Sequence, residues 1–282
     1  MNPFFRSLEF GALTLRVRDL PRVQRFYQDV LGFEVRSSLD RSVTLGTAGS
    51  TTTLVELVSA ADAPLRPRAT AGLFHVAFLY PDRPSLASAL ERVTDRRVPV
   101  GSADHGVSEA IYLADPEGNG IELYADRPRD QWPPLLPDGQ VAMFTEPLDV
   151  EALLSVASTM PVTSPRIGHV HLSVADLGHA ERFYGDWLGL SVTQRSYPGA
   201  LFLARDGYHH HIGSNVWQTS RPAMPGALGL DRLTLRLSDA GDVEAIAARL
   251  AAAGHPFLEI PDGLATADLD GIEVLVRTGG RD

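Results

Sequence analysis

The chain has 282 residues, of which 44% are hydrophobic and 21% charged, a composition typical of a soluble globular protein long enough for two domains. Its formal net charge is -10 and it contains no basic run, which argues against nucleic acid as a partner. It has no cysteine, which excludes disulfides, thiolate metal ligands and cysteine nucleophiles.

Nothing in the sequence predicts contact with a membrane. No apolar run approaches the ~20 residues of a membrane-spanning helix. The N-terminus, MNPFFRSLEF, lacks the basic and then apolar layout of a signal peptide. We therefore expect a cytoplasmic protein without membrane association.

The first regular segment is residues 13–35, LTLRVRDLPRVQRFYQDVLGFEV, which indicates a strand followed by a helix. Asp19 is the expected N-cap and Gly32 the residue that closes the helix. Residues 42–45 and 52–58 have strand character. Together they form a β-α-β-β-(β) unit.

A second informative stretch is residues 104–124, DHGVSEAIYLADPEGNGIELY. It indicates two strands, 109–113 and 120–124, joined by a turn rich in Pro and Gly. Glu122 lies in the middle of the second, otherwise apolar strand. Burying an unpaired carboxylate is costly, so a cation partner is one interpretation and a water-facing edge strand is the other.

Residues 126–166 contain seven prolines in 41 positions, a density that prevents regular strand pairing. We interpret this segment as a linker with a helical turn at 149–157. It separates an N-terminal domain, 1–125, from a C-terminal domain, 167–282.

The unit after the linker repeats the first one. Residues 170–192 align with 13–35 without a gap, and 11 of the 23 positions are identical, which indicates duplication. Weaker copies follow each strong one, at 72–125 and 229–277. The expected fold class is therefore α+β, with four βαβββ units arranged in two pairs.

Polar residues fall at equivalent positions of the four units. First strands carry, in order, Ala12, His75, His169 and Arg232; last strands carry Glu56, Glu122, one of His209–His211, and Glu273. Imidazole and carboxylate without thiolate suit borderline divalent metals, and two histidines with one carboxylate form the triad of non-haem Fe(II). A single His on an apolar strand is more often a core residue, but the repetition favours ligands.

Three further features have both a functional and a plain interpretation. We expect His209–His211 inside the last strand of the third unit, where an imidazole beside a metal suits proton transfer. The plain interpretation is a solvated strand. His105 and Tyr112 precede Glu122 in the same unit, and their plain interpretation is a loop histidine and a packed tyrosine.

The strand-DL-FY-LG-strand units and the DPEGNGIEL turn resemble the vicinal oxygen chelate superfamily, which includes glyoxalase I, bleomycin-resistance proteins and extradiol dioxygenases. LFHVAFLYPDR, the 104–124 stretch and GYHHHIGSNVW are most similar to bacterial two-domain catechol 2,3-dioxygenase-like proteins. The resemblance covers nearly all of the chain apart from the linker. It implies two open barrels, each built from a pair of units.

The resemblance also implies roles for individual residues. The metal ligands of the extradiol dioxygenases match His75, His169 and Glu122. The acid-base histidine matches His210, with His211 as a competitor. The family's neighbouring His and Tyr match His105 and Tyr112.

The implied activity is that of an Fe(II)-dependent extradiol dioxygenase that cleaves a catechol- or hydroquinone-like aromatic with O2. Mn(II), Zn(II) or Ni(II) are alternative metals, and two-domain members often associate, so a homodimer is a possible state. One alternative function is a glyoxalase-type isomerase or lyase, in which Glu56 would supply a second carboxylate. The other is a binding protein of the bleomycin-resistance kind, without catalysis.

The order of the matching residues departs from the family pattern, because they lie in the second and third units, on opposite sides of the linker. Either these two units share one barrel, which we favour, or consecutive units pair. In the second case the C-terminal pair would bind metal through His169, His209 or His211, and Glu273.

Overall fold

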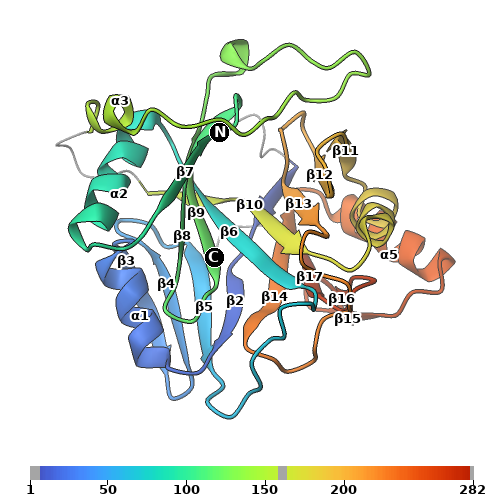
Figure 1. Ribbon diagram of the computed structural model, residues 1–282. Coiled ribbons are helices and arrows are strands. Elements are labelled where there is room, and N and C mark those ends of the chain that lie inside the picture. Colours follow the sequence, from blue (N-terminus) through green and yellow to red (C-terminus); the bar gives the residue numbers. More distant parts are fainter. Residues whose placement is uncertain (1–6, 158–163, 280–282) are drawn as a thin grey trace.

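The computed structural model describes residues 7–157 and 164–279, which form two large mixed sheets with helices packed on them (Figure 1). We name the sheets by the repeat units that build them. The 1+4 sheet contains, in spatial order, β15 (Phe257–Ile260), β16 (Gly263–Ala267), β17 (Glu273–Thr278), β14 (Gly229–Leu237), β2 (Leu13–Val17), β5 (Thr53–Ser59), β4 (Ser42–Thr47) and β3 (Phe33–Leu39), with β1 (Leu8–Phe10) beside β14. The 2+3 sheet contains β11 (Ser191–Gln194), β12 (Ala200–Ala204), β13 (Ile212–Asn215), β10 (Arg166–Ser173), β6 (Gly72–Tyr80), β9 (Gly120–Asp126), β8 (Ser108–Ala114) and β7 (Gly101–Asp104).

This topology confirms the α+β class and the pairing of the second unit with the third. Both sheets take strands from both sides of the segment 126–166, which itself contributes residues to β9 and β10. A division of the chain into domains at that segment stays a prediction. The helical turn expected there is confirmed as α3 (Val150–Leu154), with Asp149 as its N-cap.

The two sheets have the same register at their centres. In the 2+3 sheet, antiparallel β6 and β10 place His75 opposite His171 and Ala77 opposite His169. In the 1+4 sheet, antiparallel β2 and β14 place Thr14 opposite Arg232. Thr14 and Arg232 are the residues that the repeat aligns with His171 and His75, so the duplicated sequence gives duplicated strand pairing.

The helices follow the sequence signals. Asp19 caps α1 by accepting a hydrogen bond from the Arg22 amide, and Asp82 caps α2 in the same way from Ser85. The helix of the third unit begins as α-helix and continues as π-helix, unlike its copy in the first unit. The helices beyond α3 are α1 (Leu20–Asp29), α2 (Arg83–Asp95), α4 (Leu177–Ala180), the π-helix η3 (Glu181–Trp187), α5 (Ala240–Ala252) and the short 3-10 helix η2 (Arg129–Gln131).

An acidic side chain in a turn of one sheet holds the start of a helix on the other. Glu117, in the turn before β9, accepts hydrogen bonds from the amides of Arg18 and Asp19 at 2.8 and 2.7 Å. In the C-terminal half of the chain, Asp270, in the turn before β17, accepts a hydrogen bond from the Ala175 amide at 2.7 Å. Each carboxylate satisfies amides at a helix N-terminus, where negative charge is favoured.

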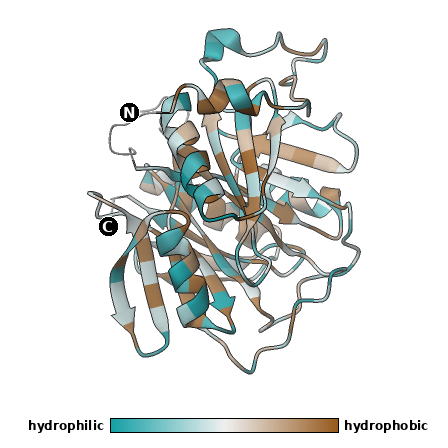
Figure 2. Ribbon diagram, turned by 60° about the vertical axis from the view of Figure 1, so that its left-hand side comes forward, coloured by the Kyte–Doolittle hydropathy of each residue, from teal (hydrophilic) through white to brown (hydrophobic). Residues whose placement is uncertain are grey.

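The apolar residues form one large core and one smaller cluster. The large core takes side chains from both sheets, and Figure 2 shows hydrophobic strands beneath helices with hydrophilic outer faces. On β9, Ile121 and Leu123 point into the large core, whereas Tyr124 belongs to the smaller cluster on the other face of the 2+3 sheet. Glu122 shares the face of Tyr124, as the alternation of a strand predicts.

None of the helices in the described ranges is both long enough and apolar enough to cross a membrane.

The turn residue Asp268 is expected to make stability depend on pH. Its carboxylate accepts hydrogen bonds from the Asp270 and Ile272 amides and from Tyr184, but burial raises the pKa of Asp268 to about 6. In the unfolded chain the pKa of an aspartate carboxyl is ~3.9. As pH rises from about 4 to 6 the unfolded state loses this proton first, so the free energy of unfolding falls by about 3 kcal/mol and then levels off.

Urea denaturation of the wild type and of Asp268→Asn at pH values from 4 to 7 measures this contribution. Asn mimics the protonated acid, so the variant's stability relative to the wild type should grow by about 3 kcal/mol over the interval. The neighbouring Asp270–His179 ion pair is present in both proteins, so its contribution cancels in the difference between their stabilities. A difference that does not change with pH would contradict the assignment.

Candidate active site

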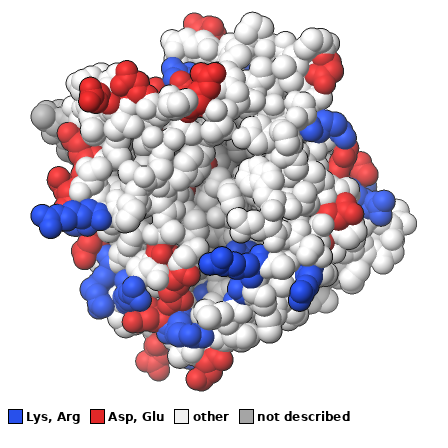
Figure 3. Space-filling view, viewed as in Figure 1, with Lys and Arg blue, Asp and Glu red and all other residues white. Residues whose placement is uncertain are grey.

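A cavity of about 300 Å³ lies on the face of the 2+3 sheet opposite the large core. The face of the molecule seen in Figure 3 is hollowed near its middle, and its charged side chains lie mostly away from that hollow. The 17 lining residues are mainly aromatic and apolar, and they include a cluster of histidines: Phe74, His75, Ala103, His105, Val107, Ser108, Tyr112, Glu122, Met143, Phe144, Thr145, His169, His171, Tyr197, Phe202, His210 and Trp217.

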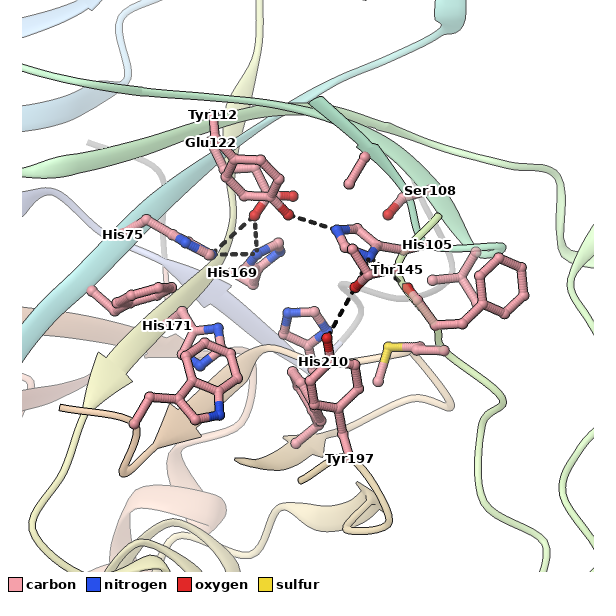
Figure 4. Close-up of a pocket in the computed structure, with 17 residues that line it drawn as sticks. His75, His105, Ser108, Tyr112, Glu122, Thr145, His169, His171, Tyr197 and His210 are labelled. Atoms are coloured by element: carbon pink, nitrogen blue, oxygen red, sulfur yellow. Dashed lines mark hydrogen bonds and ion pairs between the residues drawn. The ribbon is translucent and has the colours of Figure 1, made fainter. Parts of the chain in front are cut away.

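Three side chains meet at one end of this cavity. The carboxylate oxygen Oε2 of Glu122 lies 2.9 Å from Nε2 of His75 and 3.2 Å from Nε2 of His169, and the two Nε2 atoms are 3.4 Å apart (Figure 4). The pairing of β10, β6 and β9 places His169, Ala77 and Glu122 side by side, and His75 lies two residues before Ala77 on the same face. All three side chains are buried.

The spacing of these atoms fits a divalent cation. Ligands at about 2.1 Å from an ion and at right angles to each other are ~3.0 Å apart, close to all three distances here. Neutral imidazole with carboxylate suits Fe(II), Mn(II), Zn(II) and Ni(II). Within residues 7–157 and 164–279, no other group of three His, Asp or Glu side chains converges in this way.

The protonation states also fit. Burial acts to raise the pKa of Glu122, but the nearby His169 and His75 outweigh it and hold that pKa well below its usual value. Burial lowers the pKa of His169 to about 4, although Glu122 opposes this. At neutral pH the centre therefore offers an ionised carboxylate and a neutral imidazole, the forms that bind metal.

His105 and Tyr112 form a fixed pair at the side of the cavity. Nδ1 of His105 lies 2.7 Å from the carbonyl oxygen of Phe144, which can only accept, so Nδ1 carries the hydrogen. Nε2 then accepts a hydrogen bond from the Tyr112 hydroxyl at 2.6 Å. Burial, followed by the charge of Glu122, raises the pKa of Tyr112 well above its usual value, so the hydroxyl keeps its proton.

The histidine run does not lie inside a strand, contrary to the sequence-based expectation. β13 begins only at Ile212, because Asp206 and Gly207 adopt positive φ angles and make a wide turn before it. His210 lines the cavity, its ring centroid 4.1 Å from that of His169. His211 is outside the cavity lining: its Nδ1 accepts the Arg205 amide and its ring packs on Tyr208.

His171 is a lining residue that the sequence analysis did not assign. Its Nε2 is buried and has no hydrogen-bond partner among the residues that the structure describes, and its ring contacts the rings of Phe74 and Trp217, with centroids at 5.1 and 5.7 Å. Burial, followed by the charges of His75 and His169, holds the pKa of His171 well below its usual value. Strand alternation from His169 would have predicted its position, because residues two apart share a face.

The equivalent position in the 1+4 sheet holds an ion pair. The Arg232 guanidinium lies 3.0 Å from the Glu56 carboxylate, which also accepts a hydrogen bond from Thr14. A guanidinium cation thus neutralises the carboxylate there, and the strand carries Ala12 where the other sheet has His169.

Glu273 is not the counterpart of Glu122, contrary to the alignment of last strands. Strand register places Leu275 opposite Thr234, the copy of Ala77, whereas Glu273 lies two residues earlier on β17. Glu273 and Glu56 also belong to the 1+4 sheet, so neither joins His169 in one centre.

Comparison with known proteins agrees with this architecture. A family model described as the Glyoxalase/Bleomycin resistance protein/Dioxygenase superfamily matches residues 9–123 and 166–273. The chain belongs to this superfamily. The catechol-2,3-dioxygenase of Bacillus subtilis strain 168 is 38% identical to this chain over 276 residues, which cover 95% of this chain and 96% of that relative.

Solved structures with the same superfamily fold are more distant in sequence. A provisionally assigned dioxygenase of Bacillus subtilis superposes with a TM-score of 0.69 at 15% identity, covering 97% of this chain and 86% of that one. Glyoxalase I of Zea mays gives a TM-score of 0.59 at 18% identity, with coverages of 96% and 92%. At these identities the likeness shows the fold alone.

Proposed function

We propose that this protein is an extradiol-type ring-cleaving dioxygenase that acts on a catechol- or hydroquinone-like aromatic with O2. One observation carries the proposal: His75, Glu122 and His169 converge at the end of a cavity lined mainly by apolar and aromatic side chains. The 38% identity with a catechol-2,3-dioxygenase over nearly the whole chain supports it.

The same three residues would hold a divalent metal, Fe(II) in the first instance and Mn(II), Zn(II) or Ni(II) as alternatives. When bound, such a metal orients both reactants and makes a coordinated phenol more acidic. His210, whose ring centroid lies 4.1 Å from that of His169, would accept a substrate proton. Tyr112 donates its own hydrogen to His105, so its oxygen is free to accept a hydrogen bond from a substrate hydroxyl.

An isomerase of the glyoxalase kind is less well supported. That chemistry needs a second carboxylate as a base, and the candidate was Glu56. Glu56 lies on β5 in the 1+4 sheet, paired with Arg232, whereas Glu122 lies in the 2+3 sheet. No second carboxylate lines the cavity within the described parts of the chain.

The cavity lining favours a neutral substrate. None of the described lining residues is Lys or Arg, and Phe74, Phe144 and Trp217 supply aromatic walls. A carboxylate on the substrate would lose its hydration without gaining a cation other than the metal. Unsubstituted or alkyl-substituted catechols therefore match the cavity better than catechols that carry an acid group.

The metal centre is tested by metal analysis of protein purified without oxygen. Glu122→Gln removes the only anionic ligand, so we expect iron affinity to fall by more than the roughly 10–100-fold cost of losing an outer-shell partner. Glu56→Gln, at the matching position of the other sheet, and Glu273→Ala are controls that should keep the metal content of the wild type. Loss of metal in Glu273→Ala with retention in Glu122→Gln would refute this ligand set.

The substrate class is tested by oxygen uptake of the Fe(II)-loaded enzyme. We expect a coloured ring-fission product from 4-methylcatechol and at least ~100-fold lower kcat/KM with 3,4-dihydroxyphenylacetate, whose acid group is left unpaired. Glu122→Gln serves as the inactive control. Equal kcat/KM values would argue against a neutral-substrate cavity, and an absence of oxygen uptake with every catechol would argue against the dioxygenase itself.

A further inference from the structure

A chain of hydrogen bonds runs from His210 away from the cavity. Nδ1 of His210 lies 2.8 Å from Nδ1 of His209, and Nε2 of His209 lies 2.9 Å from Oδ1 of Asp126. Both imidazoles are buried, and Asp126 is the last residue of β9, the strand that carries Glu122. The chain therefore connects the cavity to a carboxylate on its own sheet.

The donors and acceptors in this series of hydrogen bonds can be assigned by starting from Asp126. A carboxylate oxygen accepts, so Nε2 of a neutral His209 carries the hydrogen and its Nδ1 has the lone pair. Two nitrogens 2.8 Å apart need one hydrogen between them, which must come from Nδ1 of His210. The remaining nitrogen of His210, Nε2, then has its lone pair free for a molecule in the cavity.

The surroundings hold the three side chains in place. The His209 ring packs against Tyr208 and Trp132, with centroids at 4.0 and 5.4 Å. Oδ1 of Asp126 also accepts the hydroxyl hydrogen of Tyr208 at 3.1 Å. The His209 ring cannot turn without breaking these contacts, so its Nε2 stays toward Asp126 and its Nδ1 toward His210.

A purely structural role does not explain Asp126. Its second oxygen, Oδ2, is buried and makes no hydrogen bond to any residue that the structure describes. Leaving a buried carboxylate oxygen unsatisfied costs stability. An unsatisfied buried oxygen of this kind points to a function for the carboxylate.

We propose that Asp126 and His209 are positioning residues that hold His210 in the tautomer protonated at Nδ1, with Nε2 presented to the cavity as a proton acceptor. The same logic, in which a carboxylate sets the tautomer of a histidine that acts as a base, operates in hydrolases. The inference rests on the proposed function for its catalytic consequence. The tautomer itself does not depend on that function.

The first measurement is therefore made on metal-free protein. Long-range ¹H–¹⁵N spectra of protein labelled at histidine distinguish the two neutral tautomers of an imidazole. We expect hydrogen on Nδ1 of His210 and on Nε2 of His209 in the wild type. Hydrogen on Nε2 of His210, or a doubly protonated His209, would overturn the proposal without any reference to activity.

The second measurement compares Asp126→Asn with Tyr208→Phe. An amide can donate to His209 and reverse both tautomers, so Asp126→Asn should lower kcat ~10²–10⁴-fold with KM within about two-fold. Tyr208→Phe removes the hydroxyl that donates to the same Asp126 oxygen but keeps the aromatic ring that packs on His209, so the tautomers and kcat of this variant should stay close to those of the wild type.

Equal losses of kcat in the two variants, or wild-type tautomers in Asp126→Asn, would show that Asp126 acts through general packing and would overturn the proposal. If the wild type cleaves no catechol, the proposed function fails, and the spectra of the metal-free protein still decide the tautomer of His210.

Discussion

The antiparallel pairing of β6 with β10 is the constraint on which the candidate site depends. A shift of one residue along either strand would send one of the two histidines, His75 or His169, to the opposite face of the sheet, into the large core. The register is fixed because the apolar residues that alternate with these histidines along the strands, such as Val76 on β6 and Val170 on β10, fill that core. Hydrophobic burial on one face of the sheet thus sets the geometry of the polar centre on the other.

The duplicated sheets show two solutions to one electrostatic problem. A carboxylate among apolar strands needs a positive charge close by. In the 1+4 sheet the partner is the Arg232 guanidinium, which is part of the chain and always present. In the 2+3 sheet the Glu122 carboxylate lies beside the imidazoles of His75 and His169, a donor set that fits a divalent cation. The same fold therefore has one centre whose carboxylate is paired with an arginine and one whose side chains fit a metal cation.

Much of this could be predicted from the sequence, because the signals were local or repeated. The four units, the caps and the two histidines at equivalent positions followed from periodicity and duplication. The position of the histidine run did not, because the positive φ angles of Asp206 and Gly207 lengthen the turn. Nor did the cavity walls from Met143 to Thr145, because a proline-rich segment has no periodicity to place it. Glu273 was misassigned, since a two-residue difference in register leaves the strand pattern unchanged.

The pairing of units across the linker also bears on how the molecule assembles. A chain of two such units could not complete either sheet alone and would need strands from a second copy. When residues 126–166 join the two halves, the association of two molecules is replaced by the closure of a loop within one molecule. The entropy cost of loop closure grows only slowly with the length of the loop. Assembly of the centre then no longer depends on protein concentration. Because the two halves belong to one chain, their sequences can differ, and one centre carries Arg232 where the other carries histidines.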